Sequence, residues 1–357
     1  MKISKLIAIV TTLILIGNIT LVSLEADAAT TINTNDKWDL TWSDEFTEDK
    51  INPLNWTYDI DGHGWGNNEL EYYTDRPENA RIEDGNLLIE ARNESYNGSQ
   101  YTSARLKTEG LQNFTYGKVE SRIKLPEGQG IWPAFWMLGS NMASSEWPDC
   151  GELDIMEHIN SSEYICGTMH WDSNGMHSEG GQTEIDVTKY HNYSVEWSPS
   201  YIKWFVDDTK YAEYDITNSI DGTTPFHKPF FIVLNMAVGG NWPKSPDFST
   251  EFPAKMYVDY VRVYNQHSTN SAKIQVRNAW LKNESTDSWS YLDGDGNPFK
   301  GWLYTKDYWY YLDSNGQMKT GWINDRGNWY YLNEYGVMLK NITISGYLLD
   351  SNGACIL

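Results

Sequence analysis

Three carboxylates and a histidine lie within residues 151–158, interleaved with Leu, Ile and Met. On a helix, Glu152 and Glu157 would not share a face, because neighbours on one face are three or four positions apart. On a regular strand, Glu152 and Asp154 point to one side and Glu157 points to the other. One extra residue bulged out at Ile155 and Met156 would bring Glu157 to the side of the other two acids. The spacing therefore predicts a bulged strand with three acids in a row.

A row of three acids suits the hydrolysis of glycosidic bonds. A retaining glycosidase needs two carboxyl groups about 5 Å apart, one as nucleophile and one as general acid and then base. Glu152 and Glu157 can reach that separation. Asp154 between them would help to keep one partner protonated by charge repulsion, and would hold the nucleophile by a hydrogen bond. The alternative is a solvated acidic strand face.

A divalent metal bound by Asp154, Glu157 and His158 is a second alternative for the same stretch. On a strand, however, His158 would point away from the acid row. No second His cluster with zinc spacing occurs in the sequence. These two observations favour acid–base chemistry over a metal centre.

The segments around the acidic strand carry the side chains that a sugar-binding cleft needs. The chain has 17 Trp and 24 Tyr, whose flat rings can cover the apolar faces of sugars, although some of them must pack the core. Amide side chains can both donate to and accept from hydroxyl groups. The candidates are Asn67, Trp132, Trp136, His170 and Trp242.

Length, charge and cysteine content restrict the class of protein. The 357 residues can form one large domain and a small one. A formal net charge of -22 argues against nucleic acid or an anionic membrane as a partner. Cys150, Cys166 and Cys355 do not make a disulfide framework. A pairing of Cys150 with Cys166 stays open.

Residues 1–28 have the composition of a secretory signal. Two lysines precede an apolar run over residues 6–15, and an A-x-A cleavage site follows at residues 26–28. The alternative is a membrane anchor, but Asn18 and Thr20 cut the apolar run short of a comfortable span. We expect a secreted protein that is free of the membrane after cleavage. Association with the cell surface stays open.

Residues 38–266 show the pattern of an all-β domain. Short alternating apolar runs are separated by Gly, Asn, Asp and Pro, and no segment keeps a helical period over three turns. In the run at 118–125, Val119, Ile123 and Leu125 are expected to face inward and the charges outward. The pattern predicts two packed antiparallel sheets, a β-sandwich or jelly roll.

An aromatic repeat follows the all-β domain. Its Trp-x-Tyr-Leu motif begins at Trp289, Trp309 and Trp329, at a spacing of 20 residues, which predicts a small solenoid of stacked β-hairpins. The predicted organisation is a signal peptide at 1–28, a linker at 29–37, the β domain at 38–266, a linker at 267–278 and the repeats at 279–357.

Residues 152–157 match the E-x-D-x-x-E signature of glycoside hydrolase family 16, and residues 38–266 resemble its bacterial laminarinases, which are endo-β-1,3-glucanases. The resemblance implies a β-jelly roll with a concave cleft, and retaining hydrolysis by double displacement without a cofactor. It implies that Glu152 is the nucleophile, Asp154 its helper and Glu157 the acid/base. The lichenases of the family lack a counterpart of Met156, so the sequence resembles the β-1,3 group.

The resemblance also implies a set of binding residues. Family members often hold a structural calcium ion opposite the cleft, and Glu45, the carbonyl of Gly85 and Asp259 match that site. The positions that match the lining of the cleft are Asn67, Glu120, Arg122, Trp132, Trp136, His170 and Trp242.

The repeats resemble the choline-binding, or cell-wall-binding, repeats of Gram-positive surface proteins. In those repeats, aromatic rings from adjacent hairpins surround a quaternary ammonium group by cation–π attraction. Trp302, Trp309, Trp322 and Trp329 match such positions. Related repeats bind glucan instead, and a spacer that only stacks on itself is the remaining alternative.

Together these features predict a secreted endo-β-1,3-glucanase with a C-terminal module that attaches to cell wall or glucan. Two alternatives stay open. One is a non-catalytic glucan-binding protein or adhesin, against which the three intact acids argue. The other is a hydrolase of the same fold that acts on mixed-linkage β-1,3-1,4-glucan or a galactan.

Overall fold

The computed structural model describes residues 38–266, 279–283, 288–294, 296–305 and 308–356. The predicted signal segment at 1–28 and the linkers at 29–37 and 267–278 lie outside these residues. Within the described ranges, no helix is long and apolar enough to cross a membrane.

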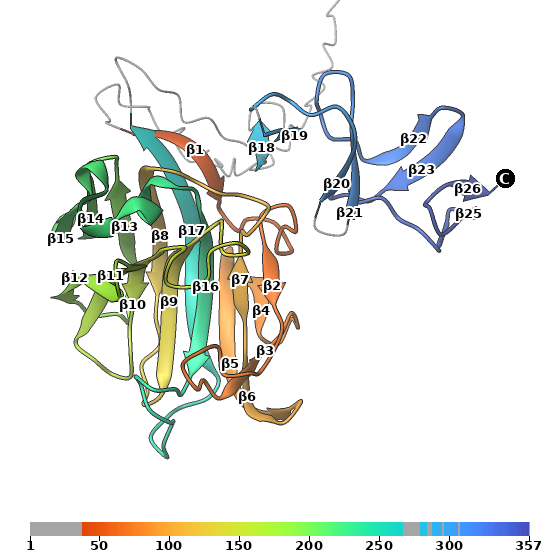
Figure 1. Cartoon of the computed structure of the whole chain (residues 1–357). Helices are drawn as coiled ribbons and strands as arrows, with labels where there is room; N and C mark the ends of the chain where they lie inside the picture. The colour runs from red at the N-terminus through yellow and green to blue at the C-terminus, as the bar shows by residue number, and fades with distance from the viewer. Residues whose placement is uncertain (1–37, 267–278, 284–287, 295, 306–307, 357) are drawn as a thin grey trace, which may run out of the picture. The chain divides into compact units, whose positions relative to one another are not determined.

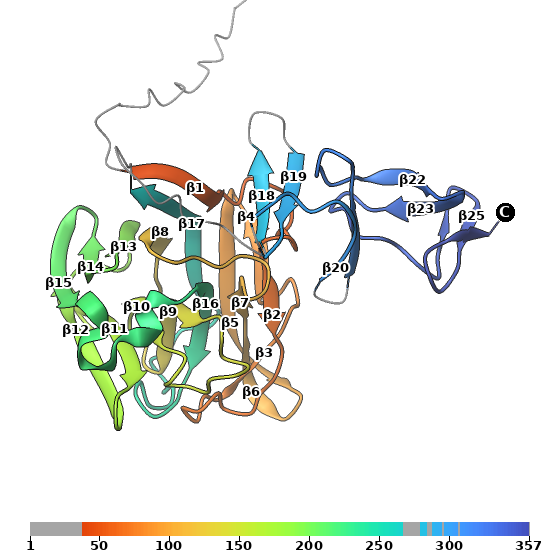
Figure 2. The same cartoon turned by 45° about the horizontal axis from the view of Figure 1, so that its top comes forward.

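Two large sheets, antiparallel except at one pair of strands, are built from the strands between Trp38 and Gln266 (Figures 1 and 2). The ten-stranded sheet contains β1 (Trp38–Asp44), β3 (Glu71–Tyr73), β4 (Ala80–Glu83), β5 (Asn86–Tyr96), β6 (Ser99–Ser103), β8 (Gly117–Lys124), β13 (His191–Trp197), β14 (Tyr201–Val206), β15 (Thr209–Asp215) and β17 (Ala254–Gln266). The seven-stranded sheet contains β2 (Thr57–Asp59), β7 (Arg105–Lys107), β9 (Ile131–Gly139), β10 (Glu152–Glu157), β11 (Tyr164–Asp172), β12 (Met176–Glu184) and β16 (Phe230–Val238).

The strand order interleaves segments that are distant in sequence. The ten-stranded sheet runs β15-β14-β13-β8-β17-β5-β6-β3, with β1 beside β17 and β4 beside β5, and the seven-stranded sheet runs β12-β11-β10-β9-β16-β7-β2. Only β3 and β6 pair in parallel among the described ladders. Two short 3-10 helices, η1 (Thr217–Gly222) and η2 (Thr224–His227), precede β16. The predicted all-β jelly roll is confirmed.

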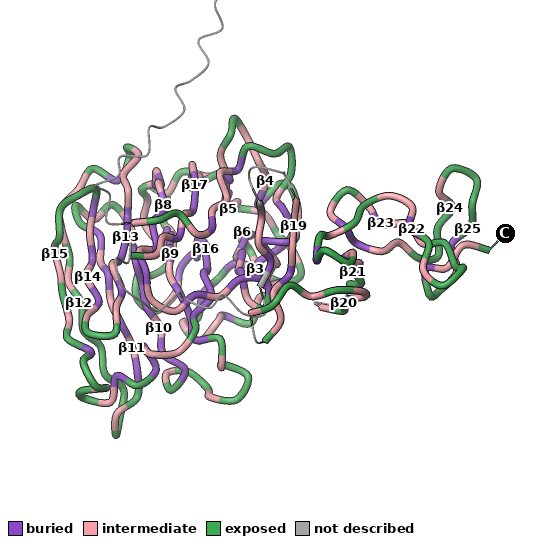
Figure 3. The backbone as a smooth tube through the Cα atoms, turned by 90° about the horizontal axis from the view of Figure 1, so that it is seen from above, coloured by how far each residue is buried: buried purple, intermediate pink, exposed green. Residues whose placement is uncertain are grey.

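Strand β16 shows how alternation assigns one face of a sheet to the core and the other to a cleft. Its residues Ile232 and Leu234 pack in the main hydrophobic cluster, which contains side chains from both sheets. The intervening Phe231 and Asn235 line a cleft on the opposite face. Figure 3 shows buried backbone positions concentrated where the two sheets meet. The inward positions Val119, Ile123 and Leu125 were predicted correctly.

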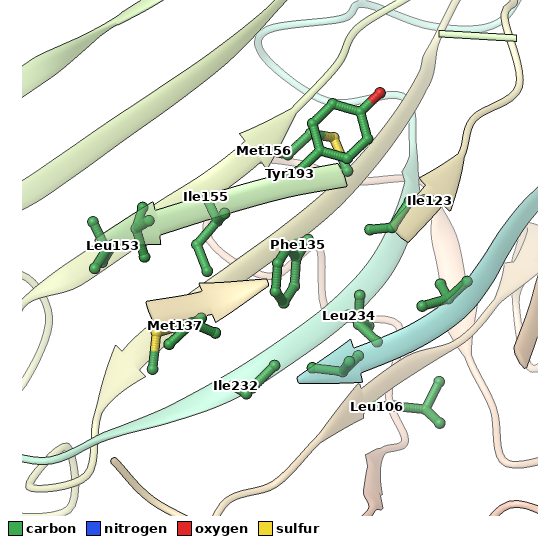
Figure 4. Close-up of a cluster of buried hydrophobic side chains, with 14 of the residues drawn as sticks. Leu106, Ile123, Phe135, Met137, Leu153, Ile155, Met156, Tyr193, Ile232 and Leu234 are labelled. Carbon is green, nitrogen blue, oxygen red and sulfur yellow. The ribbon is translucent and has the colours of Figure 1, made fainter. Parts of the chain in front are cut away.

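The bulge expected in the acidic strand is present in β10. The pairing of β10 with β9 shifts between Asp154 and Met156, and its pairing with β11 shifts between Asp154 and Glu157. Ile155 and Met156 are consecutive, yet both are fully buried in the main cluster. Figure 4 shows them on β10 together with Leu153. Because two neighbours face inward, Glu157 returns to the side of Glu152.

We expect the Met156→Ala substitution to destabilise the protein by about 2–5 kcal/mol, because a buried side chain would leave a cavity in a packed core. The free energy of unfolding from denaturant titration measures the effect. Leu40→Ala, at a side chain that is 54% exposed, serves as the control and should change stability by no more than about 0.5 kcal/mol. Equal stability of the two variants would contradict the packing described for Met156.

In the described residues of the repeat segment, the strands form four small sheets. They are β18 (Ala279–Asn283) with β19 (Ser288–Leu292), β20 (Gly301–Thr305) with β21 (Tyr308–Leu312), β22 (Gly321–Asp325) with β23 (Asn328–Leu332), and β24 (Thr343–Ile344) with β25 (Tyr347–Leu349) and β26 (Cys355–Ile356). Successive units are joined by backbone bonds at the repeat interval. The Met318 N–H donates to the Trp289 carbonyl at 2.7 Å, and the Met338 N–H to the Trp309 carbonyl at 2.8 Å. The predicted hairpin repeat is confirmed.

Candidate active site

A cleft of about 750 Å³ lies on the outer face of the seven-stranded sheet. Its floor consists of the side chains that alternate with the core positions of β9, β10, β11 and β16. Its volume is in the range of sites for small organic ligands. The cleft therefore follows directly from the period of two in these four strands.

All three acids of β10 line this cleft. His170 lies on β11, opposite Glu152 of β10. Its Nε2 atom is 3.1 Å from Asp154 Oδ2 and 3.9 Å from Glu152 Oε1. The other ring nitrogen of His170 lies 2.6 Å from the Ser178 hydroxyl, which fixes the orientation of the ring. The bulge and the neighbouring strand together bring three carboxyl groups and one imidazole into a single site.

Trp132 provides a hydrogen bond to the last acid of the row. Its indole Nε1 donates to Glu157 Oε1 at 3.0 Å. The Trp132 ring also packs edge-on against Trp242, with 5.4 Å between the ring centroids and an interplanar angle of 89°. One tryptophan thus belongs both to the wall of the cleft and to the environment of Glu157.

Burial and mutual repulsion shift the pKa values of the three acids upward. Burial raises the pKa of Asp154 to about 8. Burial, followed by repulsion from Asp154, raises the pKa of Glu157 to about 8. The same two causes raise the pKa of Glu152 well above its usual value, and the nearby His170 opposes the rise. Because the acids repel one another in a buried site, they do not all ionise near neutral pH.

The loop after β16 supplies the wall formed by Trp242. Gly239 and Gly240 have φ values of 73° and 115°, in a region that favours glycine. A Cβ atom on Gly239 would lie 2.5 Å from the Leu70 side chain. The Asn241 N–H then donates to the Asn67 carbonyl at 2.7 Å, which ties the loop to the opposite segment. The loop expected at residues 239–242 therefore contributes Trp242 to the wall of the cleft.

Five side chains predicted for the cleft do line it: Asn67, Trp132, Trp136, His170 and Trp242. The metal alternative at Asp154, Glu157 and His158 is wrong, because His158 is buried outside the cleft and its Nε2 atom bonds to the Ser162 carbonyl at 2.9 Å. In the part of the chain that the structure describes, the ligand atoms that do converge belong to Glu152, Asp154 and His170.

The assignment of Glu120 and Arg122 to the cleft is wrong. Both lie on β8 of the ten-stranded sheet, on the face opposite the core residue Val119. Glu120 accepts a bond from the Tyr260 hydroxyl at 3.1 Å, and Arg122 donates to Asp259 at 2.5 Å. The core separates these side chains from the cleft.

The side chains proposed for a calcium site do not fit a cation. Both carboxylate oxygens of Glu45 accept bonds from Arg262, at 2.9 and 2.7 Å. Asp259 is engaged by Arg122. Gly85 lies in the turn between β4 and β5, with φ of 73°. A calcium ion held by Glu45 would have to displace the Arg262 guanidinium group, and one held by Asp259 would lie beside that of Arg122.

Several residues of the cleft were not singled out in the sequence. The guanidinium group of Arg105 lies 4.8 Å from the ring centroids of Trp65 and Trp136. Asn235 accepts a bond from Trp136 Nε1 at 2.8 Å. Trp147 is 47% exposed and lies near His170, with 6.5 Å between ring centroids. A lone Asn within the apolar run of β16 was the clearest available signal, because strand positions in such a run are normally apolar.

The three cysteines are free. Cys150 is buried, and Cys166 lies in the floor of the cleft opposite Glu157 in the ladder of β10 with β11. The open question of a pairing between Cys150 and Cys166 is thus answered by two separate thiols. Burial raises the pKa of both to about 11, so neither is present as a thiolate near neutral pH.

Known proteins are similar to this chain in sequence and in fold. The family model of glycosyl hydrolases family 16 matches residues 66–262, and the cell wall binding repeat matches residues 300–318 and 320–338. A beta-glucanase of Rhodothermus marinus is 45% identical over 243 residues, which are 64% of this chain and 85% of that protein. The structure of the laminarinase from Rhodothermus marinus superposes with a TM-score of 0.60 at 44% identity, covering 65% of this chain and 98% of that one.

The alpha subunit of clotting factor G from Tachypleus tridentatus is 41% identical over 284 residues. The alignment covers 75% of this chain but 41% of that protein, so the similarity concerns part of a longer relative. The family match, in contrast, extends over more than half of this chain and includes the acidic strand and the loop of Trp242. With the bulge of β10 and the jelly roll in place, we conclude that the chain is a glycoside hydrolase and belongs to family 16.

Proposed function

We propose that the chain is a retaining endo-β-1,3-glucanase. The observation that carries the proposal is the bulge at Met156, which puts Glu152 and Glu157 on one face of β10 inside an aromatic cleft. The similar sequence from Rhodothermus marinus is named a beta-glucanase and the similar structure from that organism a laminarinase, which supports β-glucan as the substrate class.

In the proposed reaction, Glu152 attacks the anomeric carbon while Glu157 protonates the departing glycosidic oxygen. The result is a covalent glycosyl-enzyme. Glu157, now a base, removes a proton from water, and the water oxygen displaces Glu152 with net retention. The Trp132 N–H at 3.0 Å stabilises the Glu157 carboxylate after its proton has left.

Asp154 and His170 prepare the nucleophile in this scheme. Asp154 lies between the two glutamates on the same face of the strand, and His170 faces Asp154 and Glu152 at 3.1 and 3.9 Å. His170 opposes the rise in the pKa of Glu152 and so favours the anionic form of this carboxyl group. Repulsion from Asp154 favours retention of the proton on Glu157. The arrangement thereby separates the roles of two identical side chains.

A polysaccharide panel tests the proposal. The release of reducing ends should be fastest from laminarin, slower from lichenan and absent from agarose. Faster hydrolysis of lichenan would assign the enzyme to mixed-linkage glucan. Binding of laminarin without any hydrolysis would assign a lectin role instead.

We expect activity to fall as the pH rises through about 8, because burial and Asp154 raise the pKa of Glu157 to about 8 and the acid is lost above that value. The alkaline limb of kcat/KM on laminarin measures this pKa.

The free energy of unfolding should change in the same direction as the activity. The pKa values of Asp154 and Glu157 lie above their ordinary 3.8 and 4.5, so stability should fall as the pH rises from about 4 to about 8. An alkaline limb of kcat/KM near pH 5 would contradict the assignment of Glu157 as the acid.

We also propose that the repeats attach the enzyme to a polymer bearing quaternary ammonium groups. Trp302 contacts Tyr330 of the next hairpin with ring centroids 4.8 Å apart, and Trp309 at 6.3 Å. Its indole Nε1 donates to Asp325 at 3.1 Å. Trp309 is 40% exposed, so its ring remains accessible to a cation. Aromatic rings set at steep angles to one another can surround a quaternary ammonium group.

A similar cluster of aromatic rings lies one repeat later, which supports a built ligand site over a spacer. Trp322 contacts Tyr331 and Tyr347 with ring centroids 5.3 and 5.6 Å apart. Trp329, the counterpart of Trp309, is 45% exposed. In both repeats a tryptophan at the start of a hairpin therefore packs on a tyrosine of its own hairpin and on a tyrosine of the next one, while the tryptophan on the second strand stays exposed.

We expect the full chain to be retained on a choline resin and to elute with free choline. Replacing Trp309 and Trp329 by Ala should weaken retention, since each cation–π contact contributes about 0.5–2 kcal/mol. The control is Trp147→Ala, which alters the cleft and should leave retention unchanged. Binding to insoluble glucan in place of the resin would redirect the proposal to a glucan-binding module.

Secretion is part of the proposal and rests on the signal-like residues 1–28 alone. A mature chain that begins at Ala29 is expected in the culture medium, as intact mass can show. A chain that keeps Met1 and stays with the cells would count against secretion.

A further inference from the structure

Two glutamates that the proposed reaction does not use lie buried beside the cleft. Glu71 is fully buried, and Glu69 is 8% exposed and borders the cleft. Glu71 Oε2 accepts the Val238 N–H at 2.6 Å, whereas its Oε1 atom has no donor around it among the described residues. The side chains of Glu71 and Glu69 are within hydrogen-bonding reach of each other. Such a bond requires a proton on one of them.

The surrounding donors determine which acid carries the proton. Glu69 accepts at both oxygens, from the Tyr73 hydroxyl at 3.0 Å and from the Asn67 amide at 3.3 Å. Glu69 is therefore the acceptor of the pair. The oxygen left to hold the proton is Glu71 Oε1. Burial and the adjacent Glu69 raise the pKa of Glu71 well above its usual value, which agrees with this placement.

We propose that Glu71 stays protonated and donates to Glu69, and that this neutral–anionic pair is a positioning device that holds two walls of the substrate cleft. The effect on substrate rests on the proposed function, whereas the proton itself does not.

The first wall is reached through a chain of hydrogen bonds that all point toward Glu69. Trp136 Nε1 donates to Asn235 Oδ1 at 2.8 Å, and the Asn235 amide donates to the Tyr73 hydroxyl at 3.0 Å. The Tyr73 hydroxyl then donates to Glu69. Each group in this series donates to the next one. The negative charge of Glu69 therefore fixes the direction of the hydrogen bonds and the orientation of the Trp136 ring.

The second wall begins at Val238, the last residue of β16. The Val238 N–H donates to Glu71, and the Val238 carbonyl accepts from the Leu70 N–H at 2.8 Å. The loop that carries Trp242 follows immediately. Trp242 packs on Trp132, whose indole bonds to Glu157. A shift of Val238 would therefore move a wall that touches the proposed acid/base.

The charged and titratable groups around the pair provide no compensation for a second negative charge. Tyr73 remains a neutral donor, because burial and then Glu69 and Glu71 raise its pKa well above 10. Arg105 of β7 is the cation that acts on Tyr73, but its Nε atom is paired with Asp59 at 3.0 Å. Loss of the Glu71 proton would leave two adjacent buried anions, which would move apart and disturb both walls.

The Glu71→Gln variant keeps the shape and the hydrogen bonds of the side chain but cannot ionise. Its amide can donate to Glu69 and its oxygen can accept from Val238, but it has no proton to lose. We expect affinity for a laminarin oligosaccharide, measured in a Glu152→Gln background, to stay within about twofold of the parent at pH 7. The parent should lose about tenfold in affinity at alkaline pH, whereas the Glu71→Gln variant should not.

The Glu71→Leu variant removes both hydrogen bonds. Affinity should fall about tenfold or more at all pH values, since the buried Val238 N–H would lose its acceptor. In the otherwise wild-type enzyme, the substitution should raise KM more than it lowers kcat, because the pair touches the walls of the cleft and not the reacting atoms. Unchanged affinity in this variant would overturn the positioning role.

Two further measurements do not depend on the substrate. The infrared carbonyl band of a buried protonated carboxyl group should be present in the parent at pH 7 and should lose intensity in Glu71→Gln. Because the pKa of Glu71 is raised on folding, its contribution to stability is full below pH 4.5 and is lost as the pH rises through the folded-state pKa. The slope of Tm against pH should therefore be smaller in Glu71→Gln.

The matched control is Glu90→Gln, at another buried glutamate. The Glu90 carboxylate pairs with Arg81 at 2.9 Å and with Arg92 at 2.5 Å in the ten-stranded sheet. This variant should leave the infrared band and the affinity unchanged. An unaltered band and Tm slope in Glu71→Gln would overturn the proton assignment. A lost band in a protein that does not act on β-glucan would instead overturn the proposed function and leave the acid pair standing.

Discussion

The Glu152→Gln variant is expected to lose kcat on laminarin by on the order of 10⁴-fold or more, because the amide cannot attack the anomeric carbon. The fold should persist. Burial and Asp154 raise the pKa of Glu152, so an uncharged side chain at this position relieves repulsion at neutral pH. We therefore expect the Tm of the variant to equal or exceed that of the wild type.

Initial rates of reducing-end release and thermal melts of the same preparations check this result. Glu213→Gln is the matched control, since Glu213 lies on β15 in the other sheet and pairs with Lys203 at 3.4 Å. Its activity should equal that of the wild type. Normal activity in Glu152→Gln would remove Glu152 from the reaction and with it the double-displacement scheme.

The Glu157→Gln variant should lose about 10²–10⁴-fold on laminarin, because the departing sugar oxygen would no longer be protonated. An aryl β-laminaribioside that releases a phenol of low pKa does not need that proton. For this substrate the glycosyl-enzyme should still form, and its hydrolysis should become slow, since no base activates water. A burst of released phenol followed by slow turnover is the expected time course.

Azide distinguishes the two glutamates by stereochemistry. In Glu157→Gln, azide needs no general base and should attack the glycosyl-enzyme to give the β-glycosyl azide. In Glu152→Gln, azide should occupy the place of the nucleophile and give the α-glycosyl azide. Proton NMR of the products reads the configuration directly. The opposite pair of products would exchange the roles of Glu152 and Glu157.

These two variants also bear on the acid pair at Glu69 and Glu71. Both active-site variants keep Trp132 and Trp136, so their affinity for an oligosaccharide reports on the walls of the cleft without turnover. A reaction defect with unchanged affinity in Glu157→Gln, together with an affinity defect in Glu71→Leu, would separate chemistry from positioning. Such a division is expected because Glu71 lies behind the walls and Glu157 lies within them.

Local regularity explains what the sequence predicted correctly. The side chains of a strand alternate with a period of two, so the extra Met156 was enough to predict the bulge and the common face of the three acids. Alternation in the surrounding segments likewise predicted the sandwich. The repeat interval of 20 residues predicted stacked hairpins, because each unit must bury its aromatic rings on its neighbour.

Long-range packing explains what the sequence predicted wrongly or did not predict. Glu120 and Arg122 alternate in β8 as cleft residues would, but the packing of β8 against the other sheet turns them away from the cleft. Glu45 and Asp259 form ion pairs with arginines of β17 and β8 instead of a cation site. A strand's own pattern shows that it has two faces and does not show what each face meets.

The sequence by itself thus determined the row of three acids, the bulge that aligns them and the fold that presents them. Only the tertiary structure decided their protonation and their support. The bond between Asn235 and Tyr73 joins residues 162 positions apart, and the bond between Val238 and Glu71 joins residues 167 positions apart. Burial, and hence the pKa of each acid, depends on such neighbours. Those neighbours are brought together by the packing of whole sheets, which no local pattern contains.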